Sequence, residues 1–536
     1  MTYDLSRRAL LAAGGTFALS GVANMAAMTG TAPAYADSWR STLVHRERGR
    51  LVYAEDAEHN RVPDFSHAGY RNGERPLPHL PVVRTIRPIE GDNTAHIQAA
   101  LDEIAALPEH GRGALLLLPG RYPVSGTIYV RSSRTVLRGS GDGEDAAENT
   151  VITATAAGAA NRTVIVAGGE GPVNWSAWRS EVPGTRTDIV SDFVQVGSRT
   201  FEVADARGLR PGDNVIVFHP CSEGWLKAID HGGHDTGRPW YVDEEPILYN
   251  RYVTDITGNR VTVDAPVLNH LNRSLSQSYL YKTARAGVIT QVGVERLRVD
   301  VEFDGDPFAQ KSAVQNAIRI FRAEDAWIRD CTALRFWQVG MEAWEATRVT
   351  VDNCRALEPT GSTSEGGNRY NFCAHPFAQL VLFKDCHGNK ARHTFIVNGA
   401  ASASGIVFLR GTSEETYNTS EGHRRWSTGL LYDGHREVNP HRTLTLGLYN
   451  RGWWGTSHGW AAAHSVAWGC DMSGTQIVVQ KPPTAQNYVV GARNAVVNAD
   501  GPFAQPIGYV EGTGQAGPQL PSLYEAQLHE RGFRLA

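Results

Sequence analysis

Ala326-Trp-Ile-Arg-Asp-Cys331 is the first of several similar segments, and it is followed by Val349-Thr-Val-Asp-Asn-Cys354 and Leu380-Val-Leu-Phe-Lys-Asp-Cys386. Each segment is a short apolar run that ends in a polar turn residue. The two steps between the cysteines are 23 and 32 residues long. A repeat of roughly 20–50 residues is typical of solenoids and propellers.

The pattern continues through less regular copies as far as Val490, with little helical periodicity between the runs. Short runs rich in β-branched residues favour strands over helices. Stacked coils that each add one strand to a parallel sheet bury a continuous apolar column. We therefore predict an all-β fold, a right-handed parallel β-helix, with the working surface on its later coils.

Composition excludes several classes of function. The chain has 536 residues, a formal net charge of −4, 55 glycines and 26 prolines, which suits many tight turns. No bulk positive charge is available to hold nucleic acid, and no nucleic-acid partner is expected. After the N-terminus, no apolar run is long enough to span a membrane. Four of the six cysteines occupy like places in the repeat, so we expect buried thiols and not disulfides.

The N-terminus has the order of an export signal. Ser6-Arg7-Arg8-Ala9-Leu10 is a twin-arginine pattern, and an Ala/Gly-rich stretch leads to a small-x-small site that ends at Ala36. We predict export by the twin-arginine route, cleavage after Ala36, and a secreted or cell-envelope protein.

A capping helix is predicted before the first strands. Asn93 or Thr94 would begin it, and Ile97, Leu101 and Ile104 would form its apolar face. Such a helix would cover the open end of a solenoid.

The N-terminal motifs resemble a known group of proteins. Gly91-Asp-Asn-Thr-Ala95, Leu118-Pro-Gly-Arg-Tyr122 and Thr135-Val-Leu-Arg-Gly139 resemble the capping signature of the pectate-lyase superfamily, which consists of secreted right-handed β-helices. With the later repeats, the resemblance covers about two-thirds of the chain. It implies the fold but not the function, because this fold carries lyases, hydrolases, transferases and tailspikes alike.

The repeat is interrupted once, by hairpin-like segments that suggest an inserted β-domain. The predicted organisation is a signal peptide at 1–36, an extended arm at 37–90, the capping helix and first coils at 91–170, the inserted β-domain at 171–285, the main solenoid with the active groove at 286–499, and a tail with a short helix at 500–536.

Histidine, arginine and tryptophan recur together in the late coils, and residues at matching places in successive coils stack roughly 4.8 Å apart. Clusters distant in sequence would then line one groove. The candidate catalytic residues are Arg392, His393, Arg425, Arg451 and His458, and the candidate substrate-binding residues are His423, Trp426, Asn450, Trp453, Trp454, Gln486 and Asn487.

These residue types suit an acidic polysaccharide or oligosaccharide, because sugars lie on indole faces and arginine grips carboxylates. The chemistry they suggest is β-elimination from a uronic acid: one of the three arginines neutralises the substrate carboxylate, and His393 and His458, with His423 in reserve, transfer protons. Asn450, Gln486 and Asn487 would orient sugar hydroxyls.

Two other functions stay open. A glycosidase or glycosyl-transferring enzyme needs two carboxylates, for which Asp433 with Glu421, or Glu342 with Glu365, are candidates. A surface protein that binds glycans without cleaving them would use the aromatic residues alone. No metal site or cofactor is predicted, although Ca²⁺ stays possible, and side-by-side association of solenoids into a homo-oligomer is also open.

Overall fold

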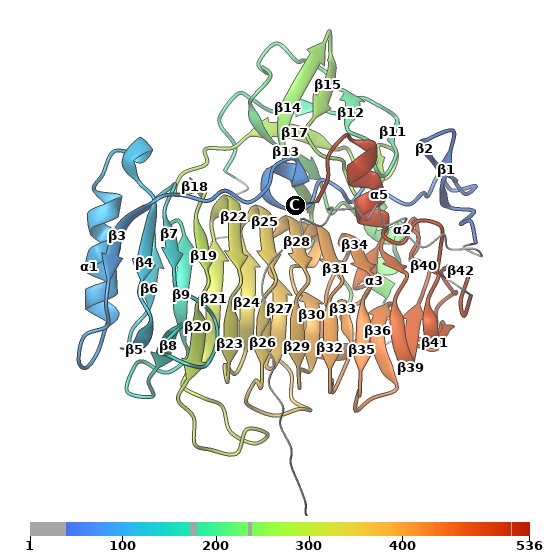
Figure 1. The fold of residues 1–536 in the computed structure, drawn as a ribbon. Helices are drawn as coiled ribbons and strands as arrows, with labels where there is room; N and C mark the ends of the chain where they lie inside the picture. The colour runs from blue at the N-terminus through green and yellow to red at the C-terminus, as the bar shows by residue number, and fades with distance from the viewer. Residues whose placement is uncertain (1–38, 172–179, 234–237, 516, 536) are drawn as a thin grey trace, which may run out of the picture. The chain divides into compact units, whose positions relative to one another are not determined.

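The computed structural model describes residues 39–171, 180–233, 238–515 and 517–535. It is a right-handed parallel β-helix, as predicted, in which the strands of successive coils lie side by side (Figure 1). The predicted signal peptide lies outside the described residues. Within them, no helix combines the length and the apolar character needed to cross a bilayer.

Each coil contributes strands to three parallel faces, which we call sheets A, B and C in chain order. Sheet A contains β4 (Ala114–Leu117), β7 (Val136–Arg138), β19 (Gly293–Glu295), β22 (Ala323–Arg329), β25 (Thr347–Asp352), β28 (Gln379–Lys384), β31 (Ser404–Leu409), β34 (Ser427–Asp433), β38 (Val466–Trp468), β40 (Tyr488–Val490) and β42 (Tyr509–Glu511). It is extended by β3 (Val82–Ile86), which pairs with β4, by β18 (Ile289–Thr290), which pairs with β22, and by β37 (Ala462–Ala463), which pairs with β34.

Sheets B and C follow sheet A around each coil. Sheet B contains β5 (Gly120–Val124), β8 (Thr150–Ala154), β20 (Arg298–Val301), β23 (Thr332–Leu334), β26 (Arg355–Leu357), β29 (His387–Asn389), β32 (Thr412–Glu414) and β35 (Arg436–Val438). Sheet C contains β6 (Ile128–Val130), β9 (Arg162–Gly168), β21 (Val314–Phe321), β24 (Val339–Trp344), β27 (Tyr370–Ala374), β30 (His393–Val397), β33 (Ser420–Gly422) and β36 (Leu444–Leu448). Strands β39 (Asp471–Val479) and β41 (Arg493–Asn498) run along both sheets.

The residue before Cys331, Cys354 and Cys386, and its equivalent in the coils without a cysteine, forms the corner between sheets A and B. Its backbone is left-handed at every coil, a conformation that Asn, Asp and Gly adopt most readily. The corner residues are Asp330, Asn353, Asp385, Arg410 and Gly434. Neighbouring corners are also linked, because Asn353 Nδ2 donates to Asp330 Oδ1 at 2.7 Å. The residue that recurs at the end of each apolar run in the sequence is therefore the turn between sheets A and B in the structure.

Inward-facing side chains of the three sheets fill the core. Cys331, Cys354, Cys386 and Cys470 are buried free thiols in it, so the expectation of stacked thiols is confirmed. Aromatic rings stack between coils: the Phe383 and Phe408 centroids are 5.1 Å apart. Offset stacking of this kind adds to the burial of apolar surface, which is the main source of stability.

Charged side chains alternate along the outer face of sheet A. Register pairs place Arg138, Glu295, Arg329, Asp352 and Lys384 on five successive strands. Glu295 forms ion pairs with Arg138 and Arg329 at 3.1 and 2.9 Å, and Lys384 pairs with Asp352 at 3.2 Å. We call this row the charge ladder. Opposite charges are register neighbours at every step, which reinforces the pairing of the strands.

Helix α1 (Thr94–Ala105) covers the first coil of the solenoid, whereas helix α5 (Leu523–Glu530) packs on the outer face of sheet A (Figure 1). Helix α1 buries Ile97, Leu101 and Ile104 against the first strands. Asn93 precedes it, but its side chain bonds Ile89 and makes no cap hydrogen bond. Helix α5 does have a cap, because Ser522 Oγ accepts from the Glu525 N–H.

A segment between β9 and β19 forms an antiparallel sheet that packs on the solenoid. Its strands are β10 (Thr187–Asp188), β12 (Thr200–Glu202), β13 (Asn214–His219), β14 (Ile247–Thr257), β15 (Arg260–Val263) and β17 (Tyr279–Lys282), and β11 (Phe193–Val194) pairs with β16 (Leu271–Asn272) beside them. Helices α2 (Glu223–Ala228) and α3 (Asp230–Gly233) follow β13. This segment shares an apolar core with Trp426 and Trp460 of the late coils.

The other short elements lie in the arm and the loops. They are β1 (Val44–Glu47), β2 (Arg50–Tyr53), α4 (Trp454–Ser457), and the 3₁₀ turns Tyr70–Gly73, Glu109–Gly111 and Ala400–Ser402. The arm contacts the outer face of sheet A, where the Gly69 N–H donates to the Leu380 carbonyl at 2.9 Å.

Buried neutral histidines make the fold sensitive to acid. Burial lowers the pKa of His219 to about 4, so between pH 6.5 and 4 the unfolded chain binds this proton and the folded chain does not. Stability from this group is therefore lost as the pH falls through that window. When the pH is lowered from 7.5 to 5.0, the free energy of unfolding of the parent should fall further than that of His219→Phe, by about 2 kcal/mol. Urea denaturation at both pH values measures this, and the same change at exposed His110 should leave the difference unaltered.

Candidate functional site

Sheet C brings the predicted imidazole and guanidinium groups together. His393 begins β30, Glu421 and His423 lie in and just after β33, and Arg451 follows β36. One atom of each of His393, Glu421 and His423 lies within 4.8 Å of the others. We call His393, Glu421, His423 and Arg451 the central cluster. The strand pairing of three successive coils assembles it.

Glu421 organises the central cluster. Its Oε1 lies 2.6 Å from His423 Nδ1, 3.5 Å from His393 Nδ1 and 3.4 Å from Arg451 Nη1. Its Oε2 accepts from the Thr419 and Tyr449 hydroxyls at 2.5 Å each. Burial raises the pKa of Glu421, but Arg451, His393 and these hydroxyls outweigh burial, so the pKa is lowered and the carboxylate stays ionised.

Hydrogen bonds assign the tautomers of the histidines. His423 Nδ1 lies 2.6 Å from Glu421 Oε1, which only accepts when ionised, and 2.8 Å from Arg451 Nη1, which only donates. We assign the shorter contact as the hydrogen bond, which places the His423 proton on Nδ1 and leaves Nε2 as the acceptor, while Arg451 Nη1 donates to the His423 carbonyl at 2.8 Å. His393 Nδ1 likewise donates to the Thr419 carbonyl at 2.6 Å. His458 is the reverse: its Nδ1 accepts from the Thr456 N–H at 3.4 Å, so Nε2 carries the proton. The cluster thus offers acceptors at His393 and His423 and a donor at His458.

All three imidazoles are held neutral. Burial lowers the pKa of His393 and His423 well below the ordinary value, and the charge of Arg451 lowers that of His423 further. Burial and then Arg451 lower the pKa of His458 to about 3. The His423 ring centroid lies 4.9 Å from those of both His393 and His458. At neutral pH the rings are therefore available as bases or neutral donors.

Arginine side chains surround the imidazoles and keep buried donors without acceptors. Among the described residues, Arg392 Nε and Nη1, Arg424 Nε and Arg451 Nε are buried and have no hydrogen-bond partner. The charges of Arg392 and Arg424 act on the His423 ring. Buried donors are normally satisfied, and a ligand that is rich in acceptors can supply the partners that these lack.

Arg425 and His458 are linked through the loop that carries α4. Arg425 Nη1 pairs with Glu245 at 2.6 Å and Glu244 at 3.2 Å, and its Nη2 donates to the Thr456 carbonyl at 2.8 Å. Arg425 therefore ties the antiparallel sheet to the His458 loop and is already paired. Gly455 leaves room for His458, since a Cβ there would lie 2.1 Å from its Nε2.

Three predicted sugar contacts are corrected by the structure. Trp426 is fully buried, and its Nε1 donates to Asn269 Oδ1 at 3.0 Å. Asn450 is fully buried and binds the Gly233 carbonyl and the Gly452 N–H. Asn487 is fully buried and binds the backbone of Ala462, Ser465 and Gln480. These side chains hold loops in place and are not available to a sugar.

The remaining predicted residues lie around the loop after β36. Trp453 is 54% exposed, and both Trp453 and Trp454 rest edge-on against Phe503 with centroids 6.0 Å apart. Arg451 lies over the Trp454 ring at 5.8 Å, which connects this loop to the central cluster. Gln486 is buried, and its Oε1 accepts from the Asn487 N–H at 3.0 Å.

Two functional candidates were not selected from the sequence. Tyr370 begins β27, and its ring centroid lies 5.4 Å from that of His393 and 5.9 Å from that of His423. Burial raises its pKa, so its hydroxyl keeps its proton at neutral pH. Glu421 was considered only as one of a carboxylate pair. Its signal is its position two residues before His423, which places both side chains on one face of a strand.

The donor set does not suit calcium. Ca²⁺ takes about six to eight oxygen ligands, whereas the central cluster offers one carboxylate and two imidazoles. Arg451 Nη1 also lies 2.8 Å from His423 Nδ1, so a cation at this point would face a guanidinium group. No step below is therefore routed through a metal.

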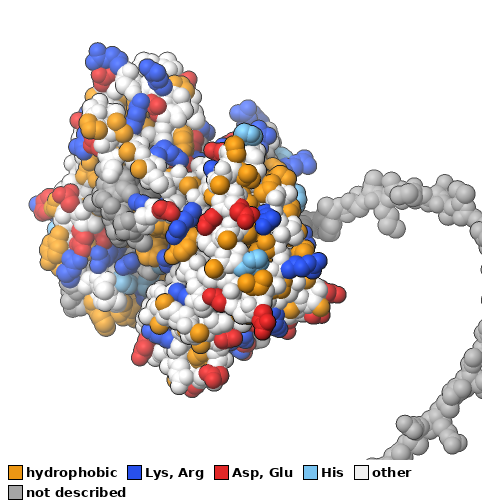
Figure 2. Space-filling model, turned by 90° about the vertical axis from the view of Figure 1, so that its left-hand side faces the viewer, with side chains coloured by type: hydrophobic (Ala, Val, Ile, Leu, Met, Phe, Trp, Pro, Cys, Tyr) orange, Lys and Arg blue, Asp and Glu red, His pale blue; other side chains and the backbone are white. Residues whose placement is uncertain are grey.

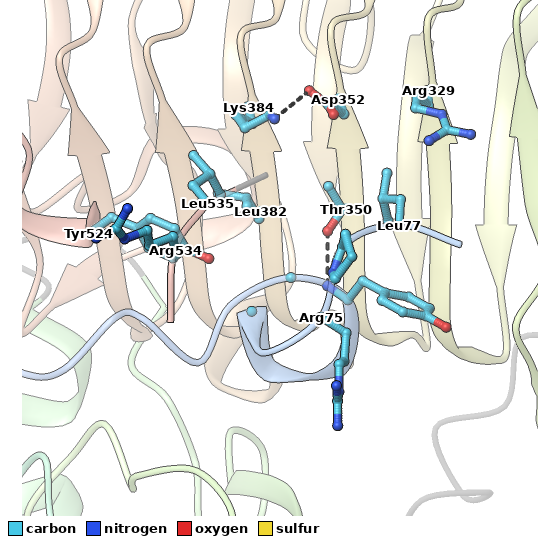
Figure 3. Close-up of a pocket in the computed structure, with 14 residues that line it drawn as sticks. Arg75, Leu77, Arg329, Thr350, Asp352, Leu382, Lys384, Tyr524, Arg534 and Leu535 are labelled. Carbon is cyan, nitrogen blue, oxygen red and sulfur yellow. Dashed lines mark hydrogen bonds and ion pairs between the residues drawn. The ribbon is translucent and has the colours of Figure 1, made fainter. Parts of the chain in front are cut away.

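A separate cavity of about 300 Å³ lies on the outer face of sheet A, between the arm and the C-terminal tail (Figure 3). It is lined partly by the charge ladder, and the ion pair of Lys384 with Asp352 is drawn in the figure. None of the predicted site residues lines it. Because Arg329 and Lys384 are already paired, we assign these charges to stability.

The surface carries no large field of one sign on the face seen in Figure 2, where acidic and basic side chains are interspersed. This agrees with the formal net charge of −4. The excess of arginine at the central cluster therefore contrasts with the mixed charges on the face seen in Figure 2.

Comparison with known proteins gives no family assignment. No protein-family model and no curated protein matches the chain. Among solved structures, the surface adhesin PfbA of Streptococcus pneumoniae aligns with TM-score 0.43 and 10% identity over 80% of this chain and 78% of its own. The tailspike gp49 of Pseudomonas phage LKA1 aligns with TM-score 0.40 and 14% identity over 76% of this chain, which spans 57% of the tailspike.

A ι-carrageenase aligns with TM-score 0.33 and 8% identity over 75% of this chain and 59% of its own. At these identities and TM-scores the similarities carry no argument about function. The parallel β-helix architecture rests on the strand pairing of the chain itself.

Proposed function

We propose that this chain is a polysaccharide lyase that cleaves an acidic glycan by β-elimination at the central cluster. The observation that carries the proposal is the convergence of Arg392, His393, His423, Arg451 and His458, from three successive coils, around one ionised carboxylate. Neutral imidazoles beside arginines with unpartnered donors provide a base and an anion site together.

The substrate carboxylate would be held by the guanidinium groups of Arg392 and Arg424. Their buried Nε groups lack acceptors, and a uronate carboxylate supplies two acceptor oxygens. Neutralising this carboxylate makes the proton on the adjacent C5 carbon more acidic, which lowers the barrier to its removal. Arg451 is engaged by Glu421 and His423, so we assign it to positioning.

His423 is the proposed base. Its Nε2 lone pair takes the C5 proton, the C5–H electrons form the C4–C5 double bond, and the C4–O4 bond breaks. Glu421 accepts from Nδ1–H and stabilises the imidazolium ion that forms. The departing O4 receives a proton from the Tyr370 hydroxyl, which is protonated at neutral pH. The imidazolium ion of His423 then returns a proton to Tyr370 through solvent.

Hydrolysis by a carboxylate pair has no support from the expected residues. Glu342 and Glu421 occupy the same register position but are three strands apart, which is about 14 Å and exceeds the roughly 6.5–9.5 Å of an inverting pair. Asp433 instead binds Ser522 and the Tyr524 N–H on sheet A. Glu365 is exposed in a loop.

Incubation with polygalacturonate, alginate and hyaluronate tests the proposal. We expect an increase in ultraviolet absorbance from the C4–C5 double bond with at least one polymer. New reducing ends without this absorbance would mean hydrolysis, and binding without products would mean a glycan-binding protein. Either result contradicts the lyase assignment. The signal at residues 1–36 supports the proposal that the protein is exported, and cleaved after Ala36, before it acts on the glycan.

The pH profile gives an independent test of the base. A base acts in its neutral form, which exists above its pKa, and the pKa of His423 lies well below its ordinary value. We therefore expect the acid limb of kcat/KM to fall below pH 6.5. Initial rates between pH 4 and 9 measure it. An acid limb at or above pH 6.5 would exclude a buried imidazole as the base.

A further inference from the structure

A row of outward side chains leads away from His423 along sheet C. Register pairs place Ala343, Ala374, Val397 and Gly422 at one position of four successive strands, β24, β27, β30 and β33 (Figure 1). The next residue on each strand is Trp344, His375, Asn398 and His423. Because Ala343, Ala374 and Val397 face the core, the residues that follow them face outward.

The spacing of this row is set by the strands. The Trp344 and His375 rings stack with centroids 4.5 Å apart and an angle of 18° between their planes, which is one strand separation. Asn398 and His423 continue at the same interval. An extended glycan that follows the row would place successive sugar units over successive strands, which are about 4.8 Å apart.

Asn398 is the free polar group in this row. Its side chain is partly exposed, and within the described residues it makes no hydrogen bond. It lies one strand from the proposed base, and its amide offers two donors and one acceptor oxygen, which suits sugar hydroxyls.

Trp344 ends the row three strands from His423. His375 stacks on its ring, and the Arg319 guanidinium lies 4.9 Å from the ring centroid. Arg319 also pairs with buried Glu342, which pairs with His375 Nε2 at 2.8 Å. The His375 ring and the Arg319 guanidinium therefore hold the indole in place, and the indole is partly exposed. Its exposed part presents a rigid apolar contact to a sugar ring.

We infer that Asn398, His375 and Trp344 form a substrate track that holds the successive sugar units on one side of the cleavage point. This inference rests on the proposed function, because it takes His423 as the cleavage centre. The substrate would then contain at least four sugar units and would lie parallel to the solenoid axis. Asn398 contacts the unit next to the reacting one, and Trp344 contacts a unit two positions further on.

Chain length tests the track. Binding of tri- and hexagalacturonate is measured by calorimetry in the His423→Gln background, in which cleavage is expected to be about 10³-fold slower. We expect Asn398→Ala to weaken both ligands about fivefold, and Trp344→Phe to weaken the hexamer about fivefold but not the trimer. The matched control Arg436→Gln, an exposed position on sheet B in the coil after that of His423, should change neither. Alginate oligomers of the same lengths are used if galacturonate does not bind.

The outcomes separate this inference from the proposed function. Equal loss for both ligands in Trp344→Phe, or no loss for the hexamer, overturns the track whatever the chemistry. Length-dependent binding by a wild-type protein that forms no C4–C5 double bond overturns the lyase and keeps the track. Loss of the trimer in Asn398→Ala together with an unchanged thermal transition confirms that the effect is local.

Discussion

His423→Gln lowers the turnover of the acidic glycan by about 10³-fold, because glutamine fills the site but has no basic nitrogen to remove the C5 proton. Its amide can still donate to Glu421, so the ionised carboxylate keeps a partner. Initial rates from ultraviolet absorbance measure the change. The effect should fall on kcat and leave KM within about threefold, since the carboxylate-binding arginines are intact.

The loss of turnover is expected because the His423 imidazole, and neither His393 nor His458, is the proposed base. His458→Gln should therefore cost less than His423→Gln, because His458 presents a donor and glutamine retains one. If His423→Gln keeps more than a tenth of the parental rate, the base is another group. His393, which also presents an acceptor nitrogen, is then the next candidate.

Glu421→Gln lowers the free energy of unfolding by about 3–5 kcal/mol, because it leaves Arg451 as a buried charge without its carboxylate. Arg451 is 6% exposed and Glu421 is fully buried, so water cannot replace the lost charge. The Thr419 and Tyr449 hydroxyls also lose an ionised acceptor. Denaturant unfolding at pH 7.5 measures the difference.

A double variant makes this result specific. Glu421→Gln combined with Arg451→Met removes both charges, so it should cost less than the two single changes added together. Glu365→Gln, at an exposed loop position, is the matched control and should change stability by less than about 0.5 kcal/mol. A Glu421→Gln protein as stable as the parent would mean that Arg451 is not dependent on this carboxylate.

Much of the fold could be predicted from the sequence, because its signal is local and repeated. The residue after each apolar run, such as Asp330 before Cys331, forms a left-handed corner, and the run itself forms the strand of sheet A. Both features recur in each coil, so the periodicity was visible without knowledge of long-range contacts.

The candidate site could be predicted only in part. The clustering of His393, His423, Arg451 and His458 followed from matching places in the repeat. Trp426 was wrong because Arg425 and Trp426 both have a left-handed backbone, and the turn they make directs the indole into the core shared with the antiparallel sheet. A contact between segments that are far apart in sequence leaves no periodic signal.

Tyr370, in contrast to Trp426, is a candidate site residue that the sequence did not reveal. It lies in a coil without the dense histidine and arginine pattern, and only the register of β27 with β30 brings it beside His393. The sequence does not show where the loop before β27 ends and the strand begins, and this boundary fixes the register.

The charge ladder of sheet A constrains how such a chain can lengthen or shorten over evolutionary time. Loss of the single coil that carries Arg329 would set Glu295 against Asp352, two carboxylates at one strand separation. Loss of two adjacent coils, those of Arg329 and Asp352, would instead set Glu295 against Lys384 and restore attraction. Along this face, the insertion or deletion of two coils therefore keeps opposite charges on neighbouring strands, whereas the insertion or deletion of one coil places like charges side by side.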